Sequence, residues 1–255
     1  MTIFILHRCL EEDRREERKI KLLGNLHKIV RKKPLKKTFL EKPLTVSLWT
    51  PGGSDGCSVA LELAHYVADT YQEKVVMVEW PCLGIPRLAI HVNLYDKEKN
   101  TDKLLLDFER SEDKEIYPIR YLLKFSDLIS VMTINPYSAP DISINLKLKK
   151  LQTMTDLPRY LKDNLYLEGY KFIIYILQGQ LHHPLTFFGV RESDQVVLNV
   201  NFPIELGWGL NCCHKLINSY NQPQQKFALY SSVLDTKTIA GITELKYLQT
   251  WESIF

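Results

Sequence analysis

A glycine-rich turn near residue 50 contains residue types that could bind phosphate. An apolar run ends at Trp49, another begins at Val59, and between them the chain reads Thr-Pro-Gly-Gly-Ser-Asp-Gly-Cys-Ser over residues 50–58. A strand, a tight glycine turn and a helix start are the context in which backbone N–H groups bind phosphate oxygens. The turn has the length of a phosphate loop, whose usual pattern is G-x-x-x-x-G-K-[ST]. The candidate phosphate-binding residues are Gly52, Gly53, Ser54, Gly56, Cys57 and Ser58.

The same turn lacks the cation that such loops use. Cys57 stands where the pattern has lysine, and Pro51 replaces the first glycine. The lysine neutralises the charge of the β- and γ-phosphates, and a thiol cannot do this. Asp55 would add repulsion inside the loop. We therefore expect a bare turn or a vestigial loop with no bound cofactor, and we keep open weak binding of ATP and Mg²⁺, with Ser58 as the magnesium-facing hydroxyl.

Two other constellations could carry chemistry, and for neither do we expect it. Cys57 at a helix start could be a nucleophile, but Asp55 opposes thiolate formation and no base is marked nearby, so we assign no catalytic residue. Cys212, Cys213 and His214, with the pair His182-His183, could suggest zinc. Adjacent cysteines on a helix point in different directions, so we expect no metal site.

The elements around the turn alternate between strands and helices. Most strand candidates are uninterrupted apolar runs, which is typical of strands buried on both faces. Such alternation predicts an α/β fold with a doubly wound, mainly parallel sheet and helices on both faces. A charged segment over 96–118 is interpreted as a surface insertion, and the C-terminal residues after 242 are expected to pack on the sheet. The expected strands are 44–49, 74–79, 128–134, 171–177, 194–200 and 227–231, and the expected helices are 58–71, 101–110, 150–168, 204–220 and 241–250.

Charge divides the 255-residue chain into two parts. Residues 1–43 hold 13 Lys/Arg and 6 Asp/Glu, whereas the remainder holds 20 and 24. We expect a basic helical arm and linker over 1–43, followed by an α/β domain with the degenerate phosphate loop over 44–255. The run Lys28–Lys37 could contact nucleic-acid phosphates, but few aromatic residues interleave with it, so a solvated linker is preferred.

Four segments, in order, resemble the ParA/MinD superfamily of ATPases. Residues 49–58 resemble its deviant phosphate loop, usually (S)PKGGxGK[ST], with Gly52 at the signature lysine and Cys57 at the second lysine. Residues 74–80 resemble its second strand, with Glu79 at the first acidic position. Residues 169–177 resemble its "YDYVIID" strand but carry Ile176 instead of the metal-associated Asp. Residues 193–200 resemble its "ADEVLLVV" strand.

The resemblance implies a P-loop NTPase-like fold, and within the superfamily the chain looks most like the CpaE/TadZ-type branch of pilus assembly and localisation proteins. Members of the superfamily dimerise around ATP, so a homodimer is one expected partner. Because both lysines and the Walker B Asp are missing, we expect a pseudo-ATPase that acts as a localisation or assembly scaffold through protein–protein binding, in pilus, secretion or conjugation-type machinery. Glu79 is then part of the nucleotide-site vestige.

Two alternatives remain open. One is a partition-type DNA-binding protein that uses the Lys28–Lys37 arm. The other is a divergent ATPase with weak nucleotide-dependent dimerisation, in which a cation such as Arg87 or a partner's residue replaces the lysine. The five cysteines, in an odd number and without C-x-x-C spacing, favour a reducing, cytoplasmic compartment. No apolar run reaches transmembrane length, and peripheral membrane association is not favoured.

Overall fold

The computed structural model describes residues 42–81, 86–111, 116–136, 151–179, 181–234, 239 and 243–255. The predicted basic arm, including the Lys28–Lys37 run, lies outside the described residues except for its last two positions.

An eight-stranded sheet forms the centre of the described domain. The strand order is β3-β4-β2-β5-β1-β6-β7-β8, and every neighbouring pair is parallel except β3 with β4. This order confirms the predicted doubly wound, mainly parallel sheet. The strands are β1 (Leu44–Thr50), β2 (Val75–Glu79), β3 (Leu123–Lys124), β4 (Ile129–Met132), β5 (Phe172–Gln178), β6 (Gln195–Asn199), β7 (Phe227–Tyr230) and β8 (Lys246–Tyr247).

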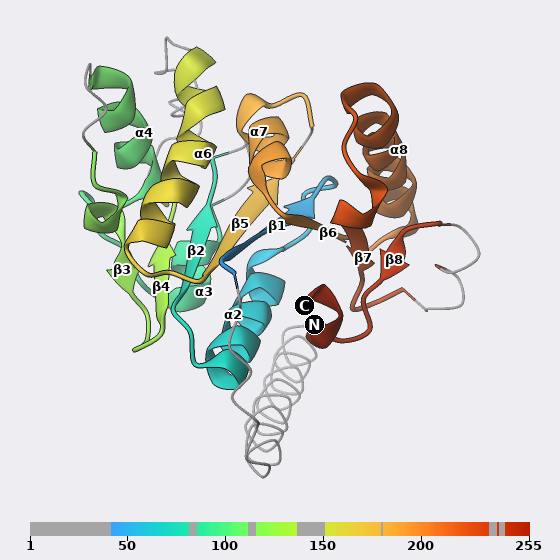
Figure 1. Ribbon diagram of the computed structural model, residues 1–255, viewed down its shortest axis with the longest axis horizontal. Helices are drawn as coiled ribbons and strands as arrows, with labels where there is room; N and C mark the ends of the chain where they lie inside the picture. Colours follow the sequence, from blue (N-terminus) through green and yellow to red (C-terminus); the bar gives the residue numbers. More distant parts are fainter. Residues whose placement is uncertain are drawn as a thin grey trace, which may run out of the picture. The chain divides into compact units, whose positions relative to one another are not determined.

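Helices cover both faces of the sheet, as Figure 1 shows. One face packs against α2 and α3, together with the C-terminal residues. The other face packs against α4, α6, α7 and α8. The helices are α2 (Cys57–Tyr71), α3 (Leu88–Val92), α4 (Thr101–Arg110), α6 (Leu151–Leu167), α7 (Pro184–Glu192) and α8 (Pro203–Tyr220), with the short 3-10 turns η1 (Pro118–Tyr121), η2 (Gln224–Lys226) and η3 (Trp251–Ile254).

The parallel arrangement brings four polar residues to one edge of the sheet. The carboxyl ends of parallel strands meet at the same edge, which is where open α/β sheets bind ligands. Thr50, Glu79, Gln178 and Asn199 end β1, β2, β5 and β6, and each is at most 1% exposed. Buried polar side chains at this edge must find partners in one another or in the loops above them. The glycine-rich turn at the end of β1 lies among them.

Two expectations about the elements were wrong. The expected helix over 241–250 is absent from residues 243–250, which contain β8; the near-helical spacing of Leu245, Leu248 and Trp251 reflects burial against the sheet instead. The charged segment 96–118 is not only a surface insertion, because α4 within it buries Leu104 and Leu105 completely. Because α4 is rich in charged residues, the composition of the segment did not reveal its apolar face.

No helix in the described part of the chain has both the length and the apolar character needed to cross a membrane.

Candidate functional site

The turn after β1 has the backbone of a loop that leads into a helix start. The N–H of Gly53 donates to the carbonyl of Thr50 at 3.1 Å, and Gly53 has φ +82°, a conformation that favours glycine. Gly56 is the N-cap residue of α2 and offers no side chain to the helix, so the first N–H groups of α2 need another acceptor. In a working phosphate loop that acceptor is a phosphate oxygen.

Asp55 provides the acceptor from within the loop. Its Oδ1 accepts the N–H of Cys57 at 2.9 Å, and its Oδ2 lies 2.6 Å from Nε2 of His91 on α3. Asn199, at the end of β6, donates from Nδ2 to the backbone carbonyl of Asp55 at 3.4 Å. The carboxylate therefore sits at the positive end of the α2 dipole, where an anionic ligand would be stabilised.

Glu205 of α8 occupies the other side of the loop. Its Oε1 accepts the hydroxyl of Ser54 at 2.5 Å, and its Oε2 accepts the N–H of Asn201 at 2.9 Å. A Cβ at Gly52 would lie 2.3 Å from Cγ of Glu205, so any other residue there would have to displace the Glu205 side chain. Glu205 is 7% exposed, and its carboxylate packs directly against the backbone that would have to receive a phosphate.

Arg87 is the cation placed at the loop. Its Nη1 donates to the carbonyl of Gly53 at 2.9 Å, so the guanidinium is bound to the turn through a backbone oxygen. The sequence had suggested Arg87 as a substitute for the missing lysine, and the structure brings it to the loop.

Cys57 points into the protein and away from the loop. The residue is fully buried, and its Sγ lies 3.8 Å from Oε1 of Glu79, to which the thiol donates. Burial, followed by the charges of Glu79 and Asp55, raises the pKa of Cys57 far above its ordinary value. The group at the lysine position is thus a buried thiol that points away from the loop, and burial favours its protonated form, which is the unreactive form of a cysteine.

Glu79 is a buried connector. It accepts the backbone N–H groups of Arg87 at 2.8 Å, of Leu88 at 3.3 Å and of Ile134 at 3.4 Å, and Nε2 of Gln178 at 3.1 Å. Burial is the largest influence on its pKa and raises it, while these hydrogen bonds act in the opposite direction. Glu79 is completely buried, and it ties the start of α3 and the end of β4 to β2.

The structure therefore brings the predicted loop residues and Glu79 together. Ser58, in the first turn of α2, is exposed, and Ile176, at the position of the metal-associated Asp, is a fully buried apolar side chain next to β1. Sequence reasoning missed Glu205, His91 and Asn199, which complete the loop's contacts from three distant segments. No motif marks them, since each belongs to an ordinary helix or strand sequence.

The zinc-like residues do not converge. Cys213 is fully buried and His214 is exposed, both on α8, whereas His183 precedes α7. Burial, with the adjacent His182, lowers the pKa of His183 to about 4. Within the described residues, no three His, Cys, Asp or Glu side chains form a group that could hold a metal ion.

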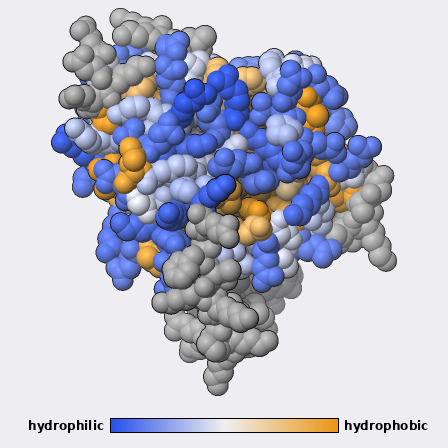
Figure 2. Space-filling view, viewed as in Figure 1, coloured by the Kyte–Doolittle hydropathy of each residue, from blue (hydrophilic) through white to orange (hydrophobic). Residues whose placement is uncertain are grey.

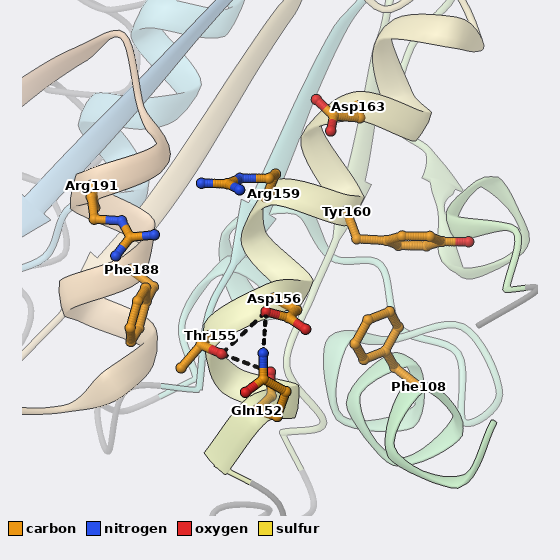
Figure 3. A pocket seen from close by; sticks show the side chains of 9 residues that line it. All are labelled: Phe108, Gln152, Thr155, Asp156, Arg159, Tyr160, Asp163, Phe188 and Arg191. Atoms are coloured by element: carbon orange, nitrogen blue, oxygen red, sulfur yellow. Dashed lines mark hydrogen bonds between the residues drawn. The ribbon is translucent and has the colours of Figure 1, made fainter. Parts of the chain in front are cut away.

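A hollow of about 470 Å³ lies away from the loop, over α4, α6 and α7. Figure 3 shows Arg159 pointing from α6 towards α7, and its guanidinium makes two 3.0 Å contacts with Glu192. Arg191 lies 4.8 Å above the ring of Phe188. These charges already have partners, and none of the predicted site residues lines this hollow. The lining residues are Phe108, Gln152, Thr155, Asp156, Arg159, Tyr160, Asp163, Phe188 and Arg191.

Comparison with solved structures shows which proteins share this fold. The chain is similar to a ParA family ATPase from Chlorobium tepidum (TM-score 0.57, 11% identity, covering 82% of this chain and 85% of that one). It is also similar to a plasmid partition protein from Borrelia burgdorferi bound to AMPPNP (TM-score 0.62, 14% identity, 81% and 84%). A third similar structure is MinD in the MinC:MinD cell division complex of Aquifex aeolicus (TM-score 0.57, 11% identity, 80% and 79%).

No protein-family model matches the sequence, and no curated protein matches it. At 11–14% identity the structural likeness concerns the backbone, since a shared fold carries many activities. The mainly parallel eight-stranded sheet with helices on both faces agrees with this likeness. The chain therefore has the fold of the ParA and MinD P-loop ATPases.

Proposed function

We propose that this protein is a pseudo-ATPase of ParA/MinD type that acts as a protein-binding scaffold. The observation that carries the proposal is the filling of the loop by the chain's own carboxylates. Asp55 caps the helix that would face a phosphate, and Glu205 lies against Gly52 and Ser54. These two carboxylates would repel the negatively charged phosphates of a nucleotide at the loop.

Missing catalytic groups support the same proposal. Hydrolysis of a nucleotide depends on cations and magnesium that neutralise charge in the transition state, and losing one such contact costs several kcal/mol. Here the lysine position holds the buried Cys57, and the position of the metal-associated Asp holds Ile176. The acidic residue at the end of β2, Glu79, is engaged by backbone N–H groups.

A fold that has lost its chemistry is kept for its surfaces. The MinD structure to which this chain is similar was determined in complex with another protein, MinC. We therefore propose a localisation or assembly role, of the pilus, secretion or conjugation type that the resemblance to CpaE/TadZ proteins implies, with a protein partner and a possible homodimer.

Phosphate release from ATP by the purified full-length chain tests the proposal. With Mg²⁺ present we expect a rate equal to that of a protein-free blank. The matched control is Ser58→Ala, which removes the hydroxyl at the position where phosphate loops bind Mg²⁺. Phosphate release that disappears in Ser58→Ala would instead favour the divergent ATPase, with Arg87 as its cation; Arg87→Met would then also abolish the release.

DNA binding through the Lys28–Lys37 run stays a prediction, because that segment is outside the described residues. A salt-sensitive shift of duplex DNA by the full chain is the measurement that supports it, and no shift at low salt would exclude it.

A further inference from the structure

The first half of α8 presents apolar side chains to solvent. Ile204 is 82% exposed, Phe202 59% and Trp208 47%. Ile204 and Trp208 are four residues apart on a helix and so lie on one face, and Phe202 immediately precedes the helix. Figure 2 shows apolar residues at the surface over α8, within a largely hydrophilic face. We call Phe202, Ile204 and Trp208 the α8 surface.

This surface belongs to the same helix that fills the loop. Glu205 lies between Ile204 and Trp208 in the sequence. Its carboxylate accepts hydrogen bonds from the hydroxyl of Ser54 and the N–H of Asn201. A buried carboxylate with two hydrogen bonds fixes the start of α8 against the loop without any nucleotide. The α8 surface is therefore preorganised, which lowers the entropic cost of binding a partner.

Leaving the large apolar side chains of the α8 surface exposed to water is unfavourable, which points to a binding role. Large apolar side chains clustered on one face mark interaction sites, and Trp is enriched among the residues that contribute most to binding. Gly207, between the two apolar positions, has open space around its Cβ position, so another backbone can approach closely there. Among residues 202–211 the only ionisable side chain is Glu205, which is turned towards the loop.

The area of the α8 surface favours a short segment over a second copy of the chain. Three side chains exposed to these fractions offer about 300–400 Å². A stable protein–protein interface buries about 800 Å² on each partner, roughly twice as much. A single helix laid along α8 needs only such a narrow strip.

A charged residue further along α8 indicates the charge expected on the partner. Ile204, Trp208, Asn211 and Lys215 follow one another at intervals of four, three and four residues, so they form one exposed line along α8, about 16 Å long. The line is apolar at its start and cationic at its end. A complementary helix carries apolar residues opposite Ile204 and Trp208 and an acidic residue opposite Lys215.

We propose that the α8 surface binds an amphipathic helix of a partner protein, with an acidic residue about 10 Å along the helix from the apolar anchor that contacts Trp208. This inference rests on the proposed scaffold function and specifies its binding surface. The binding requires no nucleotide, because Glu205 already holds α8 in place.

A photoreactive side chain identifies the partner. We would place p-benzoylphenylalanine at Trp208 in the full-length chain and, as a matched control, at Tyr117 of η1, which is 51% exposed. After illumination in cells, the adduct is mapped by mass spectrometry. We expect the probe at 208 to join a helical segment of another protein. A synthetic peptide of that segment should bind the purified chain without ATP.

Three variants then test the geometry. Ile204→Lys and Lys215→Glu should each weaken peptide binding at least tenfold, and changing the peptide's acidic residue to Lys should restore binding to Lys215→Glu. Ile90→Lys is the matched control, since Ile90 on α3 is 71% exposed on the other side of the sheet, and it should leave binding unchanged. All these positions are exposed, so unchanged melting temperatures are expected.

The proposal is overturned if the probe at 208 joins only another copy of this chain or lipid, or forms no adduct. It is also overturned if the peptide binds Ile204→Lys as well as it binds the unmodified chain. Adducts to other proteins at 117 but not at 208 would exclude the α8 surface and leave the scaffold function standing. Adducts at neither position would count against both.

Discussion

Single side chains decide the chemistry of the loop. A lysine at residue 57 would place its ammonium group next to a bound phosphate. The thiol of Cys57 instead donates to Glu79 inside the protein. Asp55 accepts the N–H of Cys57 at the start of α2, and its Oδ2 lies 2.6 Å from Nε2 of His91. On the proposed function, the loop keeps its backbone, and these side chains weaken its affinity for a nucleotide.

The buried thiol of Cys57 leads to a prediction about reactivity. Because burial and two nearby carboxylates raise its pKa, Cys57 stays protonated at pH 8, and only the thiolate reacts with iodoacetamide. We expect no alkylation of Cys57 in the folded protein and complete alkylation in denaturant, measured by peptide mass spectrometry. Rapid modification of Cys57 in the folded state would show that the loop opens.

Lys226 predicts a pH dependence of stability. Its Nζ donates to the carbonyl of Arg191 at 2.8 Å, and burial lowers its pKa from 10.5 to about 8. Between pH 8 and 10.5 the unfolded state binds more protons than the folded state at this residue, so the stability contribution of Lys226 rises with pH. The free energy of unfolding, relative to Lys226→Met, should increase by about 2–3 kcal/mol between pH 7.5 and 10.5. A difference that does not change with pH would contradict this assignment.

At this scale the sequence predicted what is missing but not what replaces it. The absent lysine is visible because a motif fixes its position. Glu205 is about 150 residues away from Ser54, and its contact depends on how α8 packs after β6. No local pattern carries that information.

At the scale of elements, the loop and α8 form one unit. Gly52 is the point of contact, because a Cβ there would lie 2.3 Å from Cγ of Glu205. The unit also explains why α8 needs no ligand to be held at its start.

A pair of glycine variants tests this contact. Gly52→Ala must displace Glu205 and should cost about 1–3 kcal/mol of unfolding free energy. Gly53→Ala meets open space but has φ +82°, so it should cost only about 1 kcal/mol of backbone strain. In Glu205→Ala the cost of Gly52→Ala should fall to a few tenths of a kcal/mol. Additive costs in the double variant, measured by denaturant unfolding, would show that the two residues do not interact.

The C-terminal element was predicted in the wrong form for a physical reason. Leu245, Leu248 and Trp251 are buried, but β8 extends the sheet by pairing with β7 and η3 then reaches α2. Apolar residues at intervals of three fit a helix, but they also fit an irregular chain in which every third side chain is buried. By contrast, α4 and α8 were predicted within one residue of their observed limits.

Trp251 should therefore be an anchor of the domain. Its ring stacks on Tyr230 with centroids 4.7 Å apart, and Nε1 donates to Oε1 of Glu62 on α2 at 3.0 Å. Trp251→Ala should lower the free energy of unfolding by about 3–5 kcal/mol. Trp251→Phe keeps an aromatic ring that can stack on Tyr230 but removes the N–H donor, so it should cost less. Equal costs for both variants would assign the loss to the hydrogen bond alone.

At the scale of the whole molecule, the fold was predictable because strand and helix signals alternate along the chain. Continuous apolar strands such as β5, whose seven residues are all buried, indicate a parallel sheet covered on both faces. The resemblance of four ordered segments added the ParA/MinD fold. The two-residue strands β3 and β8 were missed, since so short a pairing leaves no pattern in the sequence.

Calorimetric titration of the full-length chain with ATP and Mg²⁺ tests the central claim most directly. The carboxylates of Asp55 and Glu205 occupy the loop, so we predict no binding heat at millimolar ATP. Binding at micromolar strength that is lost in Ser58→Ala would contradict the account, because it would mean that the loop still receives a nucleotide in spite of both carboxylates.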